Sequence, residues 1–335
     1  MVAVKERIWR NATSKYVRLL PQAIGQTQRG RSQRLERALT DFGCEHSFAQ
    51  AAGRVLEHYG FAIPVSAVRE TTLAQAQRAR QMLEEKYQQP FRELPATGAG
   101  QIVAQTDGTM ICTVAAGKRK DKRPREWKEM RLAAAQAQGQ TTTYYAAGFS
   151  AVDAVGRRWG HCARDAGWGL QSQIQAMGDG AEWIRLQTRE VFGTQGTFLC
   201  DFFHVSEYLG AAAPSCRPHA PDRWRRTQQE RLKRGAWAKV IQALAQCLEP
   251  ENLPDELAPV RQAHRYLANR TDCIDYPRAL QLGLPIGSGL IESGHRHVLQ
   301  ARLKKAGTAW LSEHADQLAH LRVLRANGLW KNFWN

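Results

Sequence analysis

The chain has 335 residues, 43% of them hydrophobic and 23% charged, so it is long enough to bury a large core and too apolar to be disordered. It carries 47 Lys and Arg against 31 Asp and Glu, for a formal net charge of +16. A surplus of this size favours a polyanionic partner, and nucleic acid is the commonest one. No segment approaches about 18 consecutive apolar residues, and the basic start lacks an apolar stretch followed by a cleavage site, so we expect neither a membrane span nor a signal peptide.

Seven cysteines are scattered along the chain and never form a C-x-x-C pair. This spacing favours reduced thiols in a cytoplasmic protein and argues against a zinc ribbon or a disulfide framework. Cys216 and His219 stand three residues apart, but two ligands do not make a metal site.

Residues 1–98 are expected to form a helical DNA-binding region. Within it, HSFAQAAGRVLEHYGFAIPVSAVRETTLAQAQRARQML resembles a helix-turn-helix, with a first helix that ends at Tyr59-Gly60. A second helix, capped by Ser66, could lie in a major groove of DNA. A plain helical hairpin is the alternative reading. The basic side chains of this second helix are Arg69, Arg78 and Arg80.

Residues 99–209 predict the order β-β-β-α-β-α-β and therefore an α/β fold with a mixed sheet. The strands are expected in IVAQTDGTMICTVA, after the basic run GKRKDKRPRE, in TTTYYAAGF, in LQSQIQAMGDG and in GTFLCDFFHV. Helices are expected from about Phe149 to Ala163 and in AEWIRLQTREVF. Residues 210–284 read as an all-helical insertion, and residues 285–335 as one or two further helices that complete the core.

Three acidic residues stand beside glycines or serines where strands or helices should end. Asp107 lies in TDGT and Asp179 in MGDGAEW, and either could simply be a turn residue or a helix cap. Glu292 in LIESG falls in the first turn of a helix that Ser288 could cap, and an ordinary salt bridge with Arg296 is the plain alternative. Together, three carboxylates suit two Mg²⁺ ions about 4 Å apart, which catalyse phosphodiester displacement.

Several short motifs occur in a fixed order over about residues 100–335: TDGTM, WKEMRL, MGDGAEWI, LCDFFHVSEYL, IGSGLIESGHRHVLQARLKKAG and LRANGLW. This ordered set resembles bacterial insertion-sequence transposases with a DDE catalytic core, most closely the ISKra group. The resemblance implies a ribonuclease-H-like core that is split by a helical insertion before the catalytic glutamate. It also implies metal-dependent hydrolysis at transposon ends, followed by attack of the freed 3′-hydroxyl on target DNA.

Carried over to this chain, the resemblance implies that Asp107, Asp179 and Glu292 are the catalytic and metal-binding acids. The ions would be two Mg²⁺, with Mn²⁺ as a possible substitute. Asp201 competes with Asp179 for the middle position, which strand order assigns to Asp179. Asp201 and His204 would then orient the site or contact DNA, although a buried histidine bonded to backbone is an equally plain reading.

Basic residues near the acids are expected to position the DNA backbone without reading its sequence. They follow Glu292 on its helix or lie in the run from Lys118 to Arg125, which holds six basic residues in eight positions and could also be an ordinary exposed hairpin. With Arg69, the expected contacts are Lys118, Arg119, Lys120, Arg296, Arg302, Lys304 and Lys305.

The sequence therefore predicts a DNA transposase that acts on double-stranded DNA, at transposon terminal repeats and target sites. By analogy with its class, the protein is expected to be a homo-oligomer, cytoplasmic and associated with the nucleoid. Two rivals remain: a catalytically inactive, transposon-derived DNA-binding protein, and a ribonuclease-H-fold nuclease without strand transfer.

Overall fold

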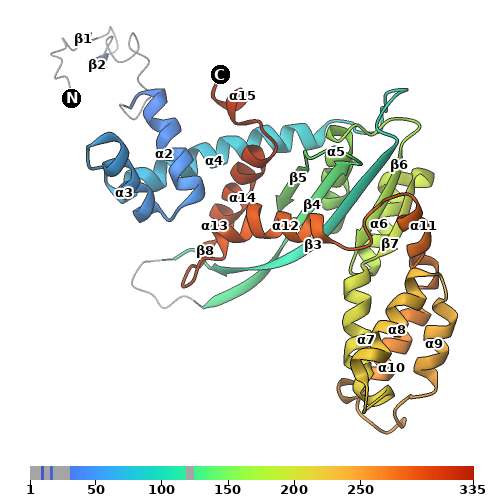
Figure 1. The fold of residues 1–335 in the computed structure, drawn as a ribbon. Coiled ribbons are helices and arrows are strands. Elements are labelled where there is room, and N and C mark those ends of the chain that lie inside the picture. The colour runs from blue at the N-terminus through green and yellow to red at the C-terminus, as the bar shows by residue number, and fades with distance from the viewer. Residues whose placement is uncertain (1–8, 11–15, 18–30, 118–123) are drawn as a thin grey trace.

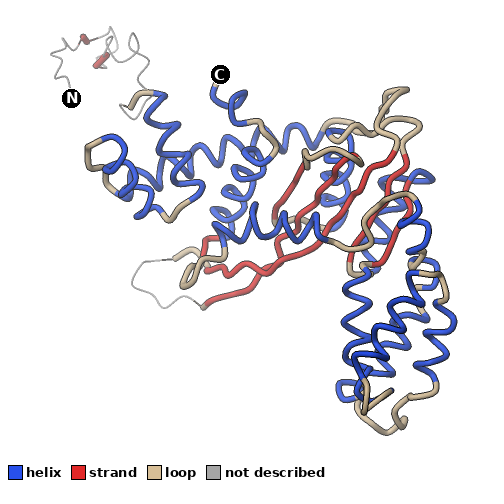
Figure 2. Tube along the Cα trace, in the orientation of Figure 1, coloured by secondary structure: helices blue, strands red, loops and turns tan. Residues whose placement is uncertain are grey.

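The structure is a computed structural model that describes residues 9–10, 16–17, 31–117 and 124–335. In this part of the chain a six-stranded mixed sheet is flanked by helices, with further helices at each end (Figures 1 and 2). The predicted α/β class with a mixed sheet is confirmed. None of the described helices has both the length and the apolar character that a bilayer crossing requires. All seven cysteines are free thiols, as their spacing predicted.

The main sheet has the strand order β5-β4-β3-β6-β7, and β8 pairs with the far end of β3. Strand β4 is antiparallel to β3 and β5, whereas β6 runs parallel to β3 and β7 runs parallel to β6. A separate pair of two-residue strands, β1 (Trp9–Arg10) and β2 (Tyr16–Val17), lies near the N-terminus. The main strands are β3 (Gln101–Val114), β4 (Arg125–Ala137), β5 (Tyr144–Gly148), β6 (Gln173–Gly178), β7 (Gly196–Cys200) and β8 (Trp310–Leu311).

Both faces of the sheet are covered, because neighbouring residues of a strand point to opposite sides. On β4 the Arg131 guanidinium lies 5.4 Å from the Trp183 ring of α6 (Glu182–Phe192), while Leu132 packs against Gly294 of α12 (Gly289–Gly294). Helix α5 (Val152–Asp165) packs beside α6, and the π-helix η4 (His295–Gln300) continues α12. Residues of β4 from Leu132 to Ala135 are accordingly all buried.

The N-terminal helices are α2 (Gln33–Glu45), α3 (Phe48–Tyr59) and α4 (Val65–Gln88). Helix α3 ends at Gly60, as predicted, but α4 starts at Val65 after Pro64, so the expected cap at Ser66 is wrong. Helix α4 packs along α14 (Ser312–Ala326). Arg78 donates to the Phe333 carbonyl and Arg80 pairs with Asp316, so these two side chains are used inside the fold.

The segment between β7 and α12 is helical and extends away from the sheet as a bundle (Figure 1). Its helices are α7 (Phe202–Cys216), α8 (Pro221–Lys233), α9 (Trp237–Ala245), α10 (Pro259–Ala268) and α11 (Tyr276–Gln281), with short 3₁₀ turns η2 (Asp255–Leu257) and η3 (Thr271–Cys273). A third 3₁₀ turn, η1 (Gly193–Gln195), precedes β7. The chain ends in α13 (Ala301–Leu303), β8, α14 and α15 (Trp330–Trp334), which is more than the one or two helices predicted there.

Two predicted boundaries are wrong for physical reasons. The strand expected in GTFLCDFFHV stops at Cys200, because the Asp201 carboxylate accepts the backbone N–H groups of Phe203 and His204 and starts α7. The helix expected from about Phe149 begins only at Val152, after β5 has ended at Gly148.

Residues 285–291, which lead into α12, are held by hydrogen bonds from β3, from β6 and from the start of α7. Gln105 of β3 donates to the Gly287 carbonyl and accepts the Ile291 N–H at 2.9 Å. Gln175 of β6 donates to the Pro285 carbonyl at 2.7 Å. The Phe202 N–H donates to the Ile286 carbonyl, so the segment is fixed from two strands and from the start of α7.

Replacing Gln105 by Leu is expected to lower the free energy of unfolding by about 2–4 kcal/mol, because two buried backbone groups lose their partners. Chemical denaturation measures this difference. Gln101→Leu on the same strand is the matched control, since the Gln101 side chain makes no hydrogen bond within the described structure, and it should stay within about 0.5 kcal/mol of the parent. Equal losses in both variants would contradict this role of Gln105.

Glu84 of α4 ties the N-terminal helices to α5 and α14. Its carboxylate accepts a hydrogen bond from His320 at 2.9 Å and pairs with Arg158, and these partners lower the pKa of Glu84 from the ordinary 4.5 to about 2. Because the folded pKa is the lower one, this stabilisation is complete above pH 4.5 and is lost as the pH falls toward 2.

Glu84→Gln should therefore be less stable than the parent at pH 7, and the gap should close as the pH approaches 2. Urea denaturation at a series of pH values measures it. The control, Glu85→Gln, removes the same charge from the exposed side of the same helix and should keep the parent's acid-dependent loss. A gap of constant size from pH 7 to 2 would show that Glu84 is not the titrating partner.

Candidate active site

Three aspartates lie in one row across the neighbouring parallel strands β3, β6 and β7. Asp179 and Asp201 directly follow the carboxyl ends of β6 and β7, whereas Asp107 lies in the middle of the longer strand β3. Gln105 of β3 is level with Met177 of β6, so two residues later Asp107 is level with Asp179. Gly178 is level with Cys200, so the next residues, Asp179 and Asp201, are level too. Ligands of open α/β sheets bind at this edge. The row follows directly from strand register.

Glu292 lies near these aspartates although it comes from a helix much later in the chain. Asp107 shares a face of β3 with Gln105, and Gln105 holds the start of α12, which carries Glu292 in its first turn. The side chains enclose a cleft of about 170 Å³. Its lining includes Asp107, Asp179, Asp201, His204, Glu207 and Glu292. Every acid that the sequence singled out thus borders the same cleft.

Asp201 is bound on both carboxylate oxygens. Its Oδ1 accepts the Phe203 and His204 N–H groups, and its Oδ2 accepts the Ser288 N–H at 3.0 Å. The residue is only 4% exposed. Asp201 therefore caps α7 and fastens the 285–291 segment at the same time.

Asp179 has the opposite character. It is exposed, and its Oδ1 accepts the Ala181 N–H, while its Oδ2 has no hydrogen bond within the described residues. The adjoining turn is held from outside, because Tyr266 donates to the Asp179 carbonyl and Arg270 to the Gly180 carbonyl. Gly180 has φ +86°, and a Cβ there would lie 2.6 Å from the Tyr266 hydroxyl. Only glycine fits this turn.

Glu292 is exposed and makes no ion pair with Arg296 within the described structure, so the salt bridge considered from the sequence is absent there. Instead the Ser288 hydroxyl donates to Glu292 Oε1 at 2.9 Å. Ser288 occupies the predicted N-cap position of α12, but its side chain makes no hydrogen bond to the helix backbone and donates to the glutamate instead. Glu292 lines the cleft, and its other carboxylate oxygen has no hydrogen-bond partner among the described residues.

His295 is a site residue that the sequence did not single out. It is 5% exposed, and its Nε2 lies 3.5 Å from Asp107 Oδ2, which is close enough for an ion pair but has no hydrogen-bond geometry. Neither ring nitrogen has a hydrogen-bond partner among the residues described. The available signal was its position, three residues after Glu292 on one helical face, and the π-helix η4 that begins there is a form often found at functional sites.

The donor set of the cleft matches magnesium in kind, because hard cations prefer carboxylate oxygens and the cleft offers several. Asp107, Asp179 and Glu292 each keep one oxygen free of hydrogen bonds within the described residues. In that same part of the chain, no three His, Cys, Asp or Glu side chains come close enough to hold one ion. The acids border one cleft, but one oxygen of each carboxylate accepts a local hydrogen bond.

His204 lies on the first turn of α7, not on a strand, and its Nδ1 is 3.4 Å from Glu207 Oε2. Its ring also packs edge-on against Tyr208 and Tyr266. Burial raises the pKa of Tyr266, which keeps the phenol protonated and able to donate to the Asp179 carbonyl. His204 therefore borders the cleft and packs against Tyr208 and Tyr266, and Tyr266 in turn supports the turn at Asp179.

The expected DNA contacts fall into three groups. Arg69, Arg296 and Lys304 are exposed, whereas Lys305 is half-buried and donates to the Glu45 carbonyl. Lys118, Arg119 and Lys120 lie outside the described residues.

Arg302 was expected to contact DNA, and the structure corrects this. It is 1% exposed, lies 4.7 Å from the Phe48 ring and 4.8 Å from the Trp310 ring, and donates to the Gly43 carbonyl. Burial lowers its pKa to about 10, which leaves the guanidinium charged at neutral pH. Arg302 fastens α13 to α2 and α3.

Comparison with known proteins links the second half of the chain to an uncharacterised family. The model of that family, described as "Uncharacterised protein family (UPF0236)", matches residues 169–333. A curated relative, the UPF0236 protein in the vanSb 3′ region of Streptococcus gallolyticus, is 26% identical over 154 residues. This match covers 43% of the chain and 31% of the relative, so the chain aligns with about a third of that protein's length. The family match contains Asp179, Asp201 and Glu292 but not Asp107.

Proposed function

We propose that the chain is a DNA transposase that catalyses metal-dependent cleavage at transposon ends and strand transfer into target DNA. One observation carries the proposal: Asp107, Asp179 and Glu292 border one cleft, although they come from the middle of β3, the end of β6 and a helix 113 or more residues further along the chain. The resemblance of the ordered motifs to DDE transposases requires these three acids to lie close together. Nothing in local sequence forces it.

The sheet supports the same proposal. Its order is β5-β4-β3-β6-β7 with β4 antiparallel to both neighbours, which is the arrangement that a ribonuclease-H-like core requires of the strand order read from the sequence. The first acid lies on the central strand, and the helical bundle enters between β7 and the glutamate helix. This agrees with the insertion that the resemblance implies.

Asp107, Asp179 and Glu292 are the residues that would hold two Mg²⁺ ions, with Mn²⁺ as a substitute. When bound, such a pair activates the attacking oxygen and stabilises the leaving oxygen of a phosphodiester. The chain's own part is to position the acids. Asp107 stands within β3 and Asp179 directly after β6, and the Ser288 hydroxyl orients Glu292. The Asp201 carboxylate keeps α12 against β7, so the cleft holds its width.

Double-stranded DNA is the proposed partner, at terminal repeats and at target sites, and a homo-oligomer is proposed by analogy. The helix pair α3 and α4 is the candidate for recognising transposon ends. Since Arg78 and Arg80 are engaged internally, the exposed first turns of α4, with Arg69, are what could enter a groove.

A specific observation favours a second candidate, a transposon-derived protein that binds DNA without cutting it. The acids make local hydrogen bonds, and the described residues contain no cluster of three ligand groups. A nuclease without strand transfer is the remaining alternative. It would cut DNA that lacks transposon ends equally well.

Amide replacements test the catalytic acids. Asp107→Asn, Asp179→Asn and Glu292→Gln should each reduce magnesium-dependent nicking of end DNA by about a thousandfold or more, because each removes a charge that holds the ions. Glu207→Gln, on the same cleft, is the matched control and should retain most activity. If all three acid variants cut as fast as the parent, the proposed triad is wrong. If the parent never cuts, the non-catalytic candidate gains.

Asp201→Asn separates a structural role from a catalytic one. An amide cannot accept on both sides, so we expect a fall in the free energy of unfolding of about 1–3 kcal/mol with nicking reduced far less than in Asp179→Asn. Thermal unfolding and nicking rates, measured on the same preparations, distinguish the structural role from the catalytic one. Unchanged stability with abolished nicking would make Asp201, not Asp179, the middle acid.

His295→Leu tests the positioning of Asp107. Removing an imidazole that has no hydrogen-bond partner should leave stability unchanged or raised, while the apparent affinity for Mg²⁺ in nicking falls about ten- to a hundredfold, as for other residues that orient a metal ligand. The exposed neighbour His297→Leu is the control. The same magnesium dependence in both variants would remove His295 from the site.

A further inference from the structure

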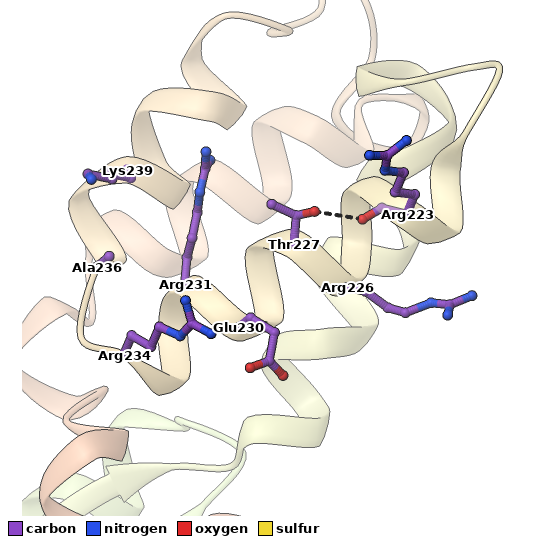
Figure 3. Close-up of a pocket in the computed structure, with 8 residues that line it drawn as sticks. All are labelled: Arg223, Arg226, Thr227, Glu230, Arg231, Arg234, Ala236 and Lys239. Carbon is purple, nitrogen blue, oxygen red and sulfur yellow. Dashed lines mark hydrogen bonds between the residues drawn. The ribbon is translucent and has the colours of Figure 1, made fainter.

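A second cavity lies on the helical bundle, away from the acidic cleft. It has a volume of about 760 Å³ and is formed by α8, the turn after it and the start of α9 (Figure 3). Five cationic side chains line it, against a single carboxylate. The cations are Arg223, Arg226, Arg231, Arg234 and Lys239.

Most of these cations have no partner inside the protein. The side chains of Arg223, Arg226, Arg234 and Lys239 make no hydrogen bond or ion pair with any other described residue. The one acid of the cavity, Glu230, pairs with Lys233 at 3.0 Å. Cations on other sides of the bundle are neutralised locally, as Arg225 is by Asp222 and Arg265 by Asp255. The cavity therefore concentrates positive charge that the fold leaves uncompensated.

The arrangement fits an extended polyanion better than a small anion. A single phosphate would be gripped by cations that converge on one point. Figure 3 shows instead that the side chains of Arg223, Arg226 and Lys239 spread apart around the cavity. From Arg223 to Arg234 the helix advances about 16 Å, which is the length of about five base pairs of a duplex.

One end of α8, the helix that carries most of these cations, lies near the acidic cleft. Helix α8 packs antiparallel to α7: Arg225 lies beside Gly210, and the Lys233 ammonium lies 5.3 Å from the Phe202 ring. Phe203, the next residue, lines the cleft. Its ring also packs where a Cβ of residue 287 would stand, which is why glycine precedes Ser288. The end of α8 at Lys233 therefore lies near the start of α7, next to a residue that lines the cleft.

We propose that the row of cations on α8, with Lys239 of α9, is a second DNA-binding surface that holds the phosphate backbone of a duplex whose neighbouring part reaches the acidic cleft. The choice of DNA over other polyanions rests on the proposed function. The contacts are to phosphates, so binding here is independent of base sequence and strongly dependent on salt.

The test uses the full chain and a 40-base-pair duplex of arbitrary sequence, in EDTA so that no cleavage occurs. Binding is followed by fluorescence anisotropy from 50 to 300 mM NaCl. Arg223→Gln, Arg226→Gln and Arg234→Gln are combined in one variant. Losing three phosphate contacts should lower the slope of log affinity against log salt by about 2–3, and weaken binding at least tenfold at 100 mM salt.

Two further variants make the result specific. A control that combines Arg157→Gln, Arg189→Gln and Lys331→Gln removes the same charge from exposed sites on α5, α6 and α15, and should keep the parent's slope within about 1. A Lys-for-Arg version of the α8 triple variant keeps the charge and should restore the slope. The Gln variant should unfold at the parent's temperature or above, since it relieves repulsion between like charges.

Equal slopes for the parent and the α8 Gln variant would overturn the inference, and so would a Lys version that fails to restore binding. Nicking by the parent is measured separately with Mg²⁺ and end DNA. A parent that never nicks but shows the α8 slope change refutes the transposase and leaves this surface standing. If the parent nicks but the α8 Gln variant keeps the parent's slope, the α8 surface is refuted and the transposase proposal stands.

Discussion

The buried amide of Gln105 is the contact on which the cleft depends. Helix α12 has six residues before its π-helical continuation, too few to hold a position by helix stability alone. Its place is set instead because the Gln105 side chain accepts from Ile291 and donates to Gly287, at a position with no solvent exposure. Water cannot replace these bonds, so any shift of α12 leaves polar groups unpaired. The glutamate of α12 is thereby fixed relative to β3.

The same strand then explains why acids from distant parts of the chain meet. Asp107 stands two residues beyond Gln105 on the same face, and register places Asp179 and Asp201 level with it. Asp201 closes the arrangement, because it caps α7 and accepts the Ser288 N–H with the same carboxylate. The buried amide on β3 and the buried carboxylate between β7 and α7 therefore hold the loop before Glu292 in place. The exposed acids are held by neighbours that are not exposed.

Much of the sheet was predictable, because its strands carry their own signals. The β-branched run of β3, the strand expected after the basic run and the alternation of strand with helix from 144 to 200 predicted the right elements in the right order. The end of β7 was missed, since the apolar residues of FFHV suit a strand and a helix alike, and only the cap made by Asp201 decides between them. Arg302 was misread for another reason. Phe48 and Trp310, which enclose its guanidinium, are separated by more than 250 residues, and no local pattern brings them together.

Net charge alone says little about where a polyanion would bind, because many of the arginines serve the interior. Arg322 donates to the Cys44, His297 and Val298 carbonyls and pairs with Glu45, which joins α2 to the C-terminal helices. The hydrogen-bond donors of such guanidinium groups are already used by acceptors inside the protein. Arg223, Arg226, Arg234 and Lys239 of the cationic cavity have no such acceptor within the described residues. The carboxylates that line the cleft repel a phosphate backbone, so a duplex needs cations close by to approach them. Uncompensated charge on the bundle supplies that attraction without placing any cation between the acids.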